Sequence, residues 1–325
     1  MAKSDDVFSV LQPINRVGRI IGFASYKIIS GPKTKRAKYE KIYNFVSIIA
    51  HSVMLIVIFM IYILDNPRMK TKRVIIRTSW LLYTVTHLVD LVTNILADKI
   101  YKLRLIHLVN KLSKVEHEIT TSGICLDYKK MKYLVPLLSL LNFVLVAIGG
   151  FYGVADSWVR NKLSSYGDII LSISFVFAVI QRAVFVGQFV SFVRIFVSML
   201  YNIDVHLEKS FLQKSGDTPT ASNMLDMLCL YQVQTLLKLS KFHQTLAEMT
   251  KELNKIVSVQ MVALFFCDFC VQTLQGYSSA NNVFNADTFH VTMFVFSMSD
   301  ILSTFVKLII ITRSVNLYMN EVNKV

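Results

Sequence analysis

Six long apolar blocks constrain the fold more strongly than any other feature of the sequence. Each is long enough to meet the roughly 20 apolar residues that a helix needs to cross a bilayer. Hydrophobic residues make up 54% of the chain, which is too many, and too clustered, for a soluble domain. The sequence therefore predicts an all-α, polytopic membrane bundle of six transmembrane helices with long cytoplasmic helix extensions. The blocks are residues 43–64, 74–97, 133–154, 169–200, 256–277 and 289–312.

Basic residues fall unevenly on the two sides of this predicted membrane. The segments between the apolar blocks alternate, and the two sets carry 25 and 6 Lys and Arg residues. Because basic residues favour the cytoplasmic side, we expect the N-terminus and, after six crossings, the C-terminus to be cytoplasmic. This distribution gives the net charge of +14 a topological explanation, and no binding of nucleic acid is predicted.

The chain accordingly divides into five parts. These are a cytoplasmic N-terminal segment (1–42), transmembrane helices 1–4 (43–200), a cytoplasmic linker and anchor helix (201–255), transmembrane helices 5–6 (256–312) and a cytoplasmic tail (313–325). The N-terminal segment begins with a basic, amphipathic stretch that we expect to lie on the membrane surface or to pack under the bundle. The fourth apolar block is about 48 Å long as a helix, so it should project into water at one end.

Residues 225–277 join an amphipathic half to an apolar half. The second half, from Ile256, is apolar on nearly every side, and no Gly or Pro separates it from the first. We therefore predict one helix that begins in the cytoplasm and continues through the fifth span. We also expect the leucine stripe of the first half to be partly uncovered if the chain folds alone. The stripe recurs at steps of three and four residues and includes Leu236, Leu239, Leu246, Met249 and Leu253.

Recognisable enzyme motifs are absent from the sequence. It contains no GxGxxG, P-loop, HExxH or GxSxG pattern. Cys267 and Cys270 have CxxC spacing, but they lie in the middle of an apolar block with no second pair nearby. We interpret them as buried structural cysteines rather than as a zinc or redox site. No enzymatic activity, cofactor or metal is predicted.

Charged residues within the apolar blocks are costly unless they are paired or hydrated. Arg182, Asp268 and Asp300 lie near the middle of their blocks, and Lys307 lies two helical turns after Asp300 on the same face. We hypothesise that these four residues form charge pairs between helices, for example Arg182 with Asp300 or Asp268. Contact with a ligand or ion is the alternative. Arg194 lies near a span end, where its side chain can reach the interface.

Aromatic, amide and imidazole side chains collect at the predicted outer halves of the spans. A small-molecule site needs an apolar cavity with a few placed polar groups, and these side chains provide both. The alternative is an aromatic belt at the membrane interface, which explains Tyr152 and Tyr277 without a ligand. The candidate ligand-binding residues are Trp80, Tyr83, Tyr152, Phe175, Gln181, Gln272, His290 and Phe294.

Three segments resemble insect gustatory receptors. Residues 236–261, LLKLSKFHQTLAEMTKELNKIVSVQM, resemble the family's cytoplasmic helix leading into the fifth span. Residues 11–23 resemble the short motif before the first span, and residues 300–325 resemble the sixth span and the turn after it. In the first segment the family's positions are occupied by Leu236, His243, Leu246, Leu253 and Asn254.

The resemblance implies a subunit of a ligand-gated cation channel in the plasma membrane of sensory neurons. Such a channel is a homo- or heterotetramer with other gustatory receptors, is surrounded by membrane lipids, and is opened by a small-molecule tastant. The family's pore-lining seventh span, with Thr-Tyr and then Gln-Phe, does not occur before Val325. A non-conducting truncated copy is therefore an alternative expectation. A G-protein-coupled receptor would need an external N-terminus, and a transporter would need internal repeats; the sequence favours neither.

Overall fold

The computed structural model describes residues 6–20, 26–27, 35–36, 74–126, 128, 137, 140, 144, 166–212, 222–284 and 291–323. Within these residues, β1 pairs with β2 in an antiparallel ladder that places Tyr26 opposite Arg36. No pattern in the sequence predicted this ladder in the N-terminal segment. All other described elements are helices. The elements are α1 (Val7–Ile20), β1 (Tyr26–Lys27), β2 (Lys35–Arg36), α3 (Val74–Thr121), α5 (Tyr166–Leu212), α6 (Ser222–Phe284) and α7 (Val291–Val322).

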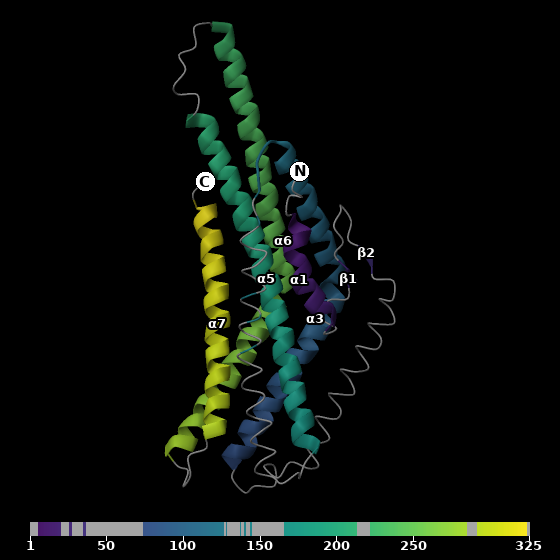
Figure 1. The fold of residues 1–325 in the computed structure, drawn as a ribbon, viewed down its shortest axis with the longest axis vertical. Helices are drawn as coiled ribbons and strands as arrows, with labels where there is room; N and C mark the ends of the chain where they lie inside the picture. The colour runs from purple at the N-terminus through teal and green to yellow at the C-terminus, as the bar shows by residue number, and fades with distance from the viewer. Residues whose placement is uncertain are drawn as a thin grey trace.

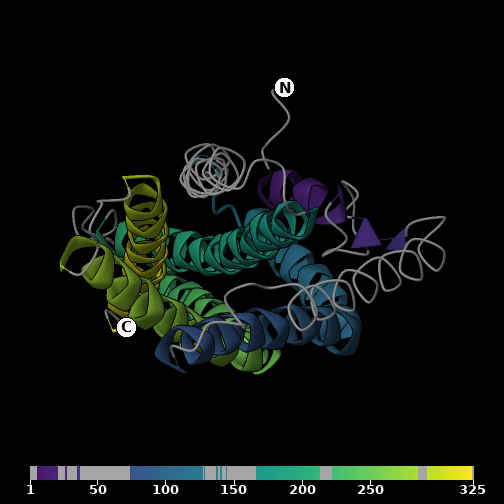
Figure 2. The ribbon, with the colours of Figure 1, turned by 90° about the horizontal axis from the view of Figure 1, so that it is seen from below.

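The four long helices run along the long axis of the molecule, and α6 runs opposite to α3, α5 and α7 (Figure 1). α3 packs along α6, and α5 packs along α7. Seen from below, α1 lies beside α5 (Figure 2). The C-terminal end of α5 and the N-terminal end of α6 extend beyond the other helices at the top of Figure 1. The segments predicted to be cytoplasmic therefore gather at one end of the bundle.

Three of the described helices are long and apolar enough to cross a membrane. The qualifying segments are Gln181–Lys209, Val233–Leu274 and Ile301–Val322. They overlap the predicted fourth, fifth and sixth spans. The predicted span 43–64, and all but three residues of 133–154, lie outside the described residues. The chain is thus a helical membrane bundle, while its six spans and their orientation stay predictions.

α6 is a single helix of 63 residues, as predicted for residues 225–277. α5 has 47 residues and continues beyond the end of the fourth apolar block at residue 200, while the projection of that block into water stays a prediction. α3 has 48 residues, so the second apolar block and the segment after it form one helix. The long helix extensions that the apolar pattern indicated are therefore present in the structure.

A glycine stops α3. Gly123 adopts a φ of 86°, a left-handed conformation that residues with a Cβ rarely adopt. The Gly123 N–H donates to the Thr120 carbonyl at 3.0 Å, and the Ile124 N–H donates to the Ile119 carbonyl at 3.3 Å. Ile119 and Ile124 are both buried, which completes a Schellman motif with its hydrophobic contact. The chain therefore turns back toward the bundle directly after Thr121.

Most of the largest fully buried side chains lie in the half of the bundle that the charge distribution assigns to the cytoplasm. They come from α3, α5 and α6, with Tyr128 from the segment after α3, and each is less than 2% exposed. The leucine stripe of α6 is covered from Leu239 onward by α3 and α5, and it is exposed at Leu236. The expected uncovered patch is therefore confined to the N-terminal part of the described stripe. The buried side chains include Leu108, Leu112 and Ile119 of α3, Phe196, Met199 and Ile203 of α5, and Leu246 and Met249 of α6.

α1 packs against α3 and α5 and buries Val7, Phe8, Val10, Leu11 and Ile14. Of the two expected positions for this segment, packing against the bundle is therefore the observed one.

Two carboxylates cap the start of α1. The Asp6 Oδ1 atom accepts the Ser9 N–H at 2.8 Å, and the Glu116 Oε1 atom of α3 accepts the Val7 N–H at 3.0 Å. Burial raises the pKa of Glu116 from 4.5 to about 7, the Val7 N–H opposes this shift, and the negative charge of Asp6 adds to it. A carboxylate on α3 therefore ties down the N-terminal helix and titrates near neutral pH.

The raised pKa of Glu116 predicts a pH dependence of stability. Between about pH 4.5 and 7 the folded state keeps a proton that the unfolded state releases, so this contribution to stability is full below pH 4.5 and is lost as pH rises through 7. Glu116→Gln keeps the acceptor and removes the charge. We expect it to raise the thermal midpoint of the detergent-solubilised protein at pH 8 by a few °C. This shift corresponds to a gain on the order of one kcal/mol in the free energy of unfolding.

The matched control is Glu118→Gln, which changes an exposed carboxylate two residues away on α3. The difference in midpoint between Glu116→Gln and the wild type should vanish at pH 4, where both states carry the proton in the wild type. An equal effect of the two substitutions at pH 8 would show that the buried position of Glu116 does not cause the change in stability.

Candidate functional site

A cluster of three charged side chains joins α5, α6 and α7 in the interior of the bundle. The Asp268 carboxylate of α6 accepts hydrogen bonds from Lys307 Nζ of α7 at 2.9 and 3.0 Å. It also accepts one from Arg182 Nη1 of α5 at 3.3 Å. Arg182, Asp268 and Lys307 are 3%, 5% and 3% exposed. One buried carboxylate thus holds two cations from neighbouring helices.

The three residues lie at one level of the bundle. Arg182 follows the first residue of α5 by 16 positions, Lys307 follows the first residue of α7 by 16, and Asp268 precedes the last residue of α6 by 16. At about 1.5 Å per residue, each is about 24 Å from the same end of the bundle. The long helices therefore bring together side chains that are far apart in the sequence.

Neutral polar contacts surround this charge cluster. Gln272 Nε2 of α6 donates to Thr304 Oγ1 of α7 at 2.9 Å. The Cys267 thiol of α6 donates to the Thr86 carbonyl of α3 at 3.3 Å. Both contacts lie within one helical turn of Asp268 or Lys307. The polar faces of these helices thus point inward, and α6 contacts all three of its neighbours there.

Such a cluster can hold helices in register. Buried charges are stable only when they are paired and hydrogen-bonded, so sliding or rotating α7 against α6 would separate Lys307 from Asp268 at a cost of several kcal/mol.

The structure places the predicted charged residues as follows. Arg182 and Asp268, one of the two pairings considered from the sequence, lie 3.3 Å apart. Lys307 bonds to Asp268, a pairing that falls within the hypothesis of charge pairs among these four residues but was not one of its two examples. Asp300 lies on α7, but its side chain is outside the described part of the structure, so the Arg182–Asp300 pairing stays a prediction.

The candidate ligand-binding residues stay predictions. Gln181 is buried at 2% exposure next to Arg182. Gln272 and Phe294 are half-buried on α6 and α7, and Gln272 bonds to Thr304. Tyr152 and His290 lie outside the described residues, as do the side chains of Trp80, Tyr83 and Phe175.

The sequence analysis did not predict the two neutral contacts, although the sequence contained a signal for the Gln272–Thr304 bond. Thr304 lies three residues before Lys307 and Gln272 lies four after Asp268, so each shares a helical face with a residue that was singled out. The Cys267–Thr86 bond had no such signal, because its acceptor is a backbone carbonyl on a helix 181 positions away in sequence.

Comparison with known proteins agrees with this architecture. The family model described as 7tm Chemosensory receptor matches residues 11–325. Among curated proteins, no sequence matches the chain. The family match covers α1 from Leu11 onward, all four long helices and the charge cluster, and the similarity to gustatory receptors noted in the sequence agrees with it. The chain therefore belongs to the 7tm Chemosensory receptor family.

Proposed function

We propose that this chain is a gustatory receptor, a subunit of a ligand-gated cation channel in the plasma membrane of sensory neurons. A small-molecule tastant binds among the outer halves of the spans, and the subunit assembles as a homo- or heterotetramer with other receptors of the family. Membership of a chemosensory family supports the receptor role. The tastant, the channel activity and the tetramer are parts of the proposal.

The continuity of α6 supports the coupling step of this proposal. α6 is a single helix that bears Asp268 of the charge cluster and, about 20 residues earlier, Leu246 and Met249 of the cytoplasmic-side core. A helix of this kind transmits a shift at one end to the other because its backbone hydrogen bonds are continuous. A tastant that binds one arrangement of the charge cluster better would therefore shift the population of both halves.

The direct test is a tastant-evoked cation current. We expect a current in cells that express the chain together with other receptors of the family. We expect Gln272→Leu, which breaks the bond to Thr304, to change the tastant concentration for half-maximal response by about 3- to 10-fold. Gln244→Leu is the matched control, because Gln244 is an exposed glutamine on the cytoplasmic half of the same helix.

Two other results would exclude the proposal. A surface-expressed chain that yields no current with any partner would favour the non-conducting copy. An epitope at the N-terminus that stains intact cells would contradict the cytoplasmic N-terminus and favour a G-protein-coupled receptor, because that class needs an external N-terminus.

A further inference from the structure

Arg194 of α5 and Arg313 of α7 are like charges that act on each other, and neither has a counter-ion among the residues that the structure describes. Arg194 of α5 is half-buried, and its Nε atom is buried with no hydrogen-bond partner among the described residues. The positive charge of Arg313 on α7 acts unfavourably on it. Neither arginine forms a salt bridge within the part of the chain that the structure describes. Two like charges held together in this way favour the binding of an anion between them.

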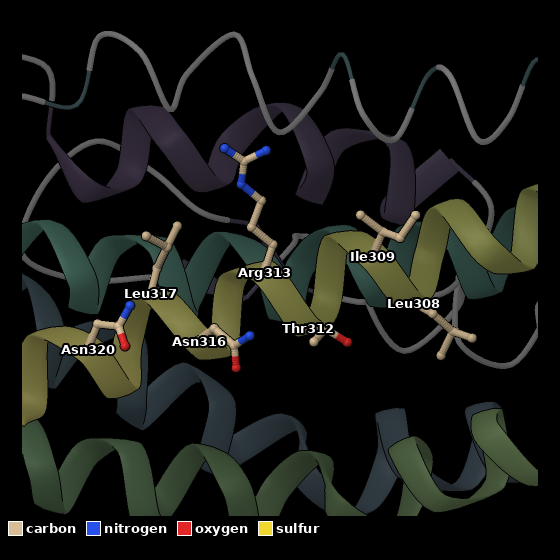
Figure 3. Close-up of a pocket in the computed structure, with 7 residues that line it drawn as sticks. All are labelled: Leu308, Ile309, Thr312, Arg313, Asn316, Leu317 and Asn320. Atoms are coloured by element: carbon tan, nitrogen blue, oxygen red, sulfur yellow. The ribbon is translucent and has the colours of Figure 1, made fainter.

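A groove of about 460 Å³ runs along α7 past Arg313. In Figure 3 the side chains of Ile309 and Arg313 leave the helix on one side, and those of Leu308, Thr312 and Asn316 leave it on the other. Leu308 and Ile309 lie at one end of the groove, Arg313 lies near the middle, and Asn316, Leu317 and Asn320 lie at the other end. The groove is therefore mostly apolar, and Arg313 is the charged residue among those that line it.

An exposed apolar surface extends this groove along the same face of α7. Leu302, Phe305 and Ile309 are 52%, 58% and 62% exposed, and they follow one another at steps of three and four residues. An acyl chain would cover this stripe without leaving its bilayer environment. The stripe ends beside Arg313, so apolar and cationic surfaces meet as they do in the binding site of a phospholipid.

The level of the two arginines fits the boundary between hydrocarbon and headgroups. The level of the charge cluster serves as the reference, because Arg182 and Asp268 lie near the middle of their apolar blocks. Arg313 lies six residues beyond Lys307, and Arg194 lies twelve beyond Arg182. These separations place the two arginines about 9 and 18 Å from the cluster along the bundle. Half of a hydrocarbon core is about 15 Å thick. Arginine side chains within a few ångströms of that boundary extend to the headgroup phosphates.

We propose that an anionic phospholipid of the cytoplasmic leaflet binds in this groove, its phosphate bridging Arg194 of α5 and Arg313 of α7. Asn320 donates a hydrogen bond to its headgroup, and one acyl chain lies along Leu302, Phe305 and Ile309. Arginine suits this role because its planar fork binds phosphate oxygens in pairs. The lipid neutralises the repulsion between the two helices and holds α5 against α7 on the cytoplasmic side of the charge cluster. This site depends on the predicted orientation of α7 and not on channel activity.

The test compares the purified protein in nanodiscs of phosphatidylcholine alone and of phosphatidylcholine mixed with phosphatidylserine. We expect the anionic lipid to raise the thermal midpoint. We expect Arg313→Gln and Arg194→Gln each to weaken apparent phosphatidylserine affinity, measured by native mass spectrometry, by about 5-fold. Arg104→Gln is the control, because Arg104 is an exposed arginine of α3 that contacts Tyr101 instead and should retain the full effect.

Several outcomes would overturn the lipid site. An equal loss in Arg104→Gln would show that phosphatidylserine binds only through general surface charge. Equal stabilisation by inorganic phosphate in detergent would identify a free anion rather than a lipid. A change in oligomeric mass in Arg313→Gln, with unchanged lipid dependence, would assign the groove to a second copy of the chain. Because Arg313 is exposed, its substitution should leave the fold intact, which a monodisperse elution profile would verify.

Discussion

Asp268→Asn is expected to be among the most destabilising single substitutions in this protein, with a loss of about 3–5 kcal/mol. Asp268 is the shared acceptor of Lys307 and Arg182, at 2.9 and 3.3 Å. An asparagine there leaves two buried cations without the carboxylate, and neither can reach water because both are 3% exposed. The measurement is the thermal midpoint of the detergent-solubilised protein, followed by fluorescence-detected size-exclusion chromatography.

Lys307→Met is the informative comparison. It removes one of the two cations and leaves Asp268 bonded to Arg182, so its cost should be clearly smaller than that of Asp268→Asn. The double variant should be less destabilised than the sum of the two single variants, because it leaves one cation fewer without a partner. Equal losses for the two single variants, with strict additivity, would mean that the cluster is not organised around Asp268.

Phe196→Ala is expected to cost about 3–5 kcal/mol. Phe196 lies on α5 at 0% exposure, within the core formed with Leu246 and Met249 of α6 and with α3. Truncating a fully buried aromatic ring removes its transfer free energy and leaves a cavity that close-packed neighbours fill only in part. The thermal midpoint, and the fraction of protein that elutes as a folded species, both report the loss.

Phe269→Ala is the matched control for this prediction. Phe269 is 70% exposed on the apolar half of α6, where detergent or lipid replaces the lost ring contacts. Its truncation should therefore change the free energy of unfolding by only about 0.5 kcal/mol. If the two substitutions cost the same, the core on the cytoplasmic side would not be the main source of stability.

The apolar pattern was sufficient to predict the apolar parts of the long helices that the structure describes. The absence of Gly and Pro between the halves of residues 225–277 predicted one helix, and α6 is one helix. The pattern did not predict how far α3 continues, because its end depends on Gly123 and on the burial of Ile124 against the bundle. The position of α1 was left open between the membrane surface and the bundle, since an amphipathic helix suits both.

The charge cluster was only partly predictable. A charged residue in an apolar block must find a partner, and this reasoning named Arg182 and Asp268. It did not show that Lys307 shares the same carboxylate, because the sequence contains no information on the relative rotation of α6 and α7. The electrostatic interaction of Arg194 with Arg313 depends on the same rotation and was not anticipated. The candidate ligand-binding residues stay predictions, since most of their side chains lie outside the described part of the structure.

The sequence by itself determined that this chain is a helical membrane protein with long helix extensions, because apolar length and period are local properties that each segment carries alone. It also determined the family, which later comparison established. Only the tertiary structure decided which buried charges meet, that the largest fully buried side chains lie mainly where α3, α5 and α6 pack together, and that α1 is held by Glu116. Those features depend on the relative position of helices far apart in the chain, and a one-dimensional pattern does not specify that position.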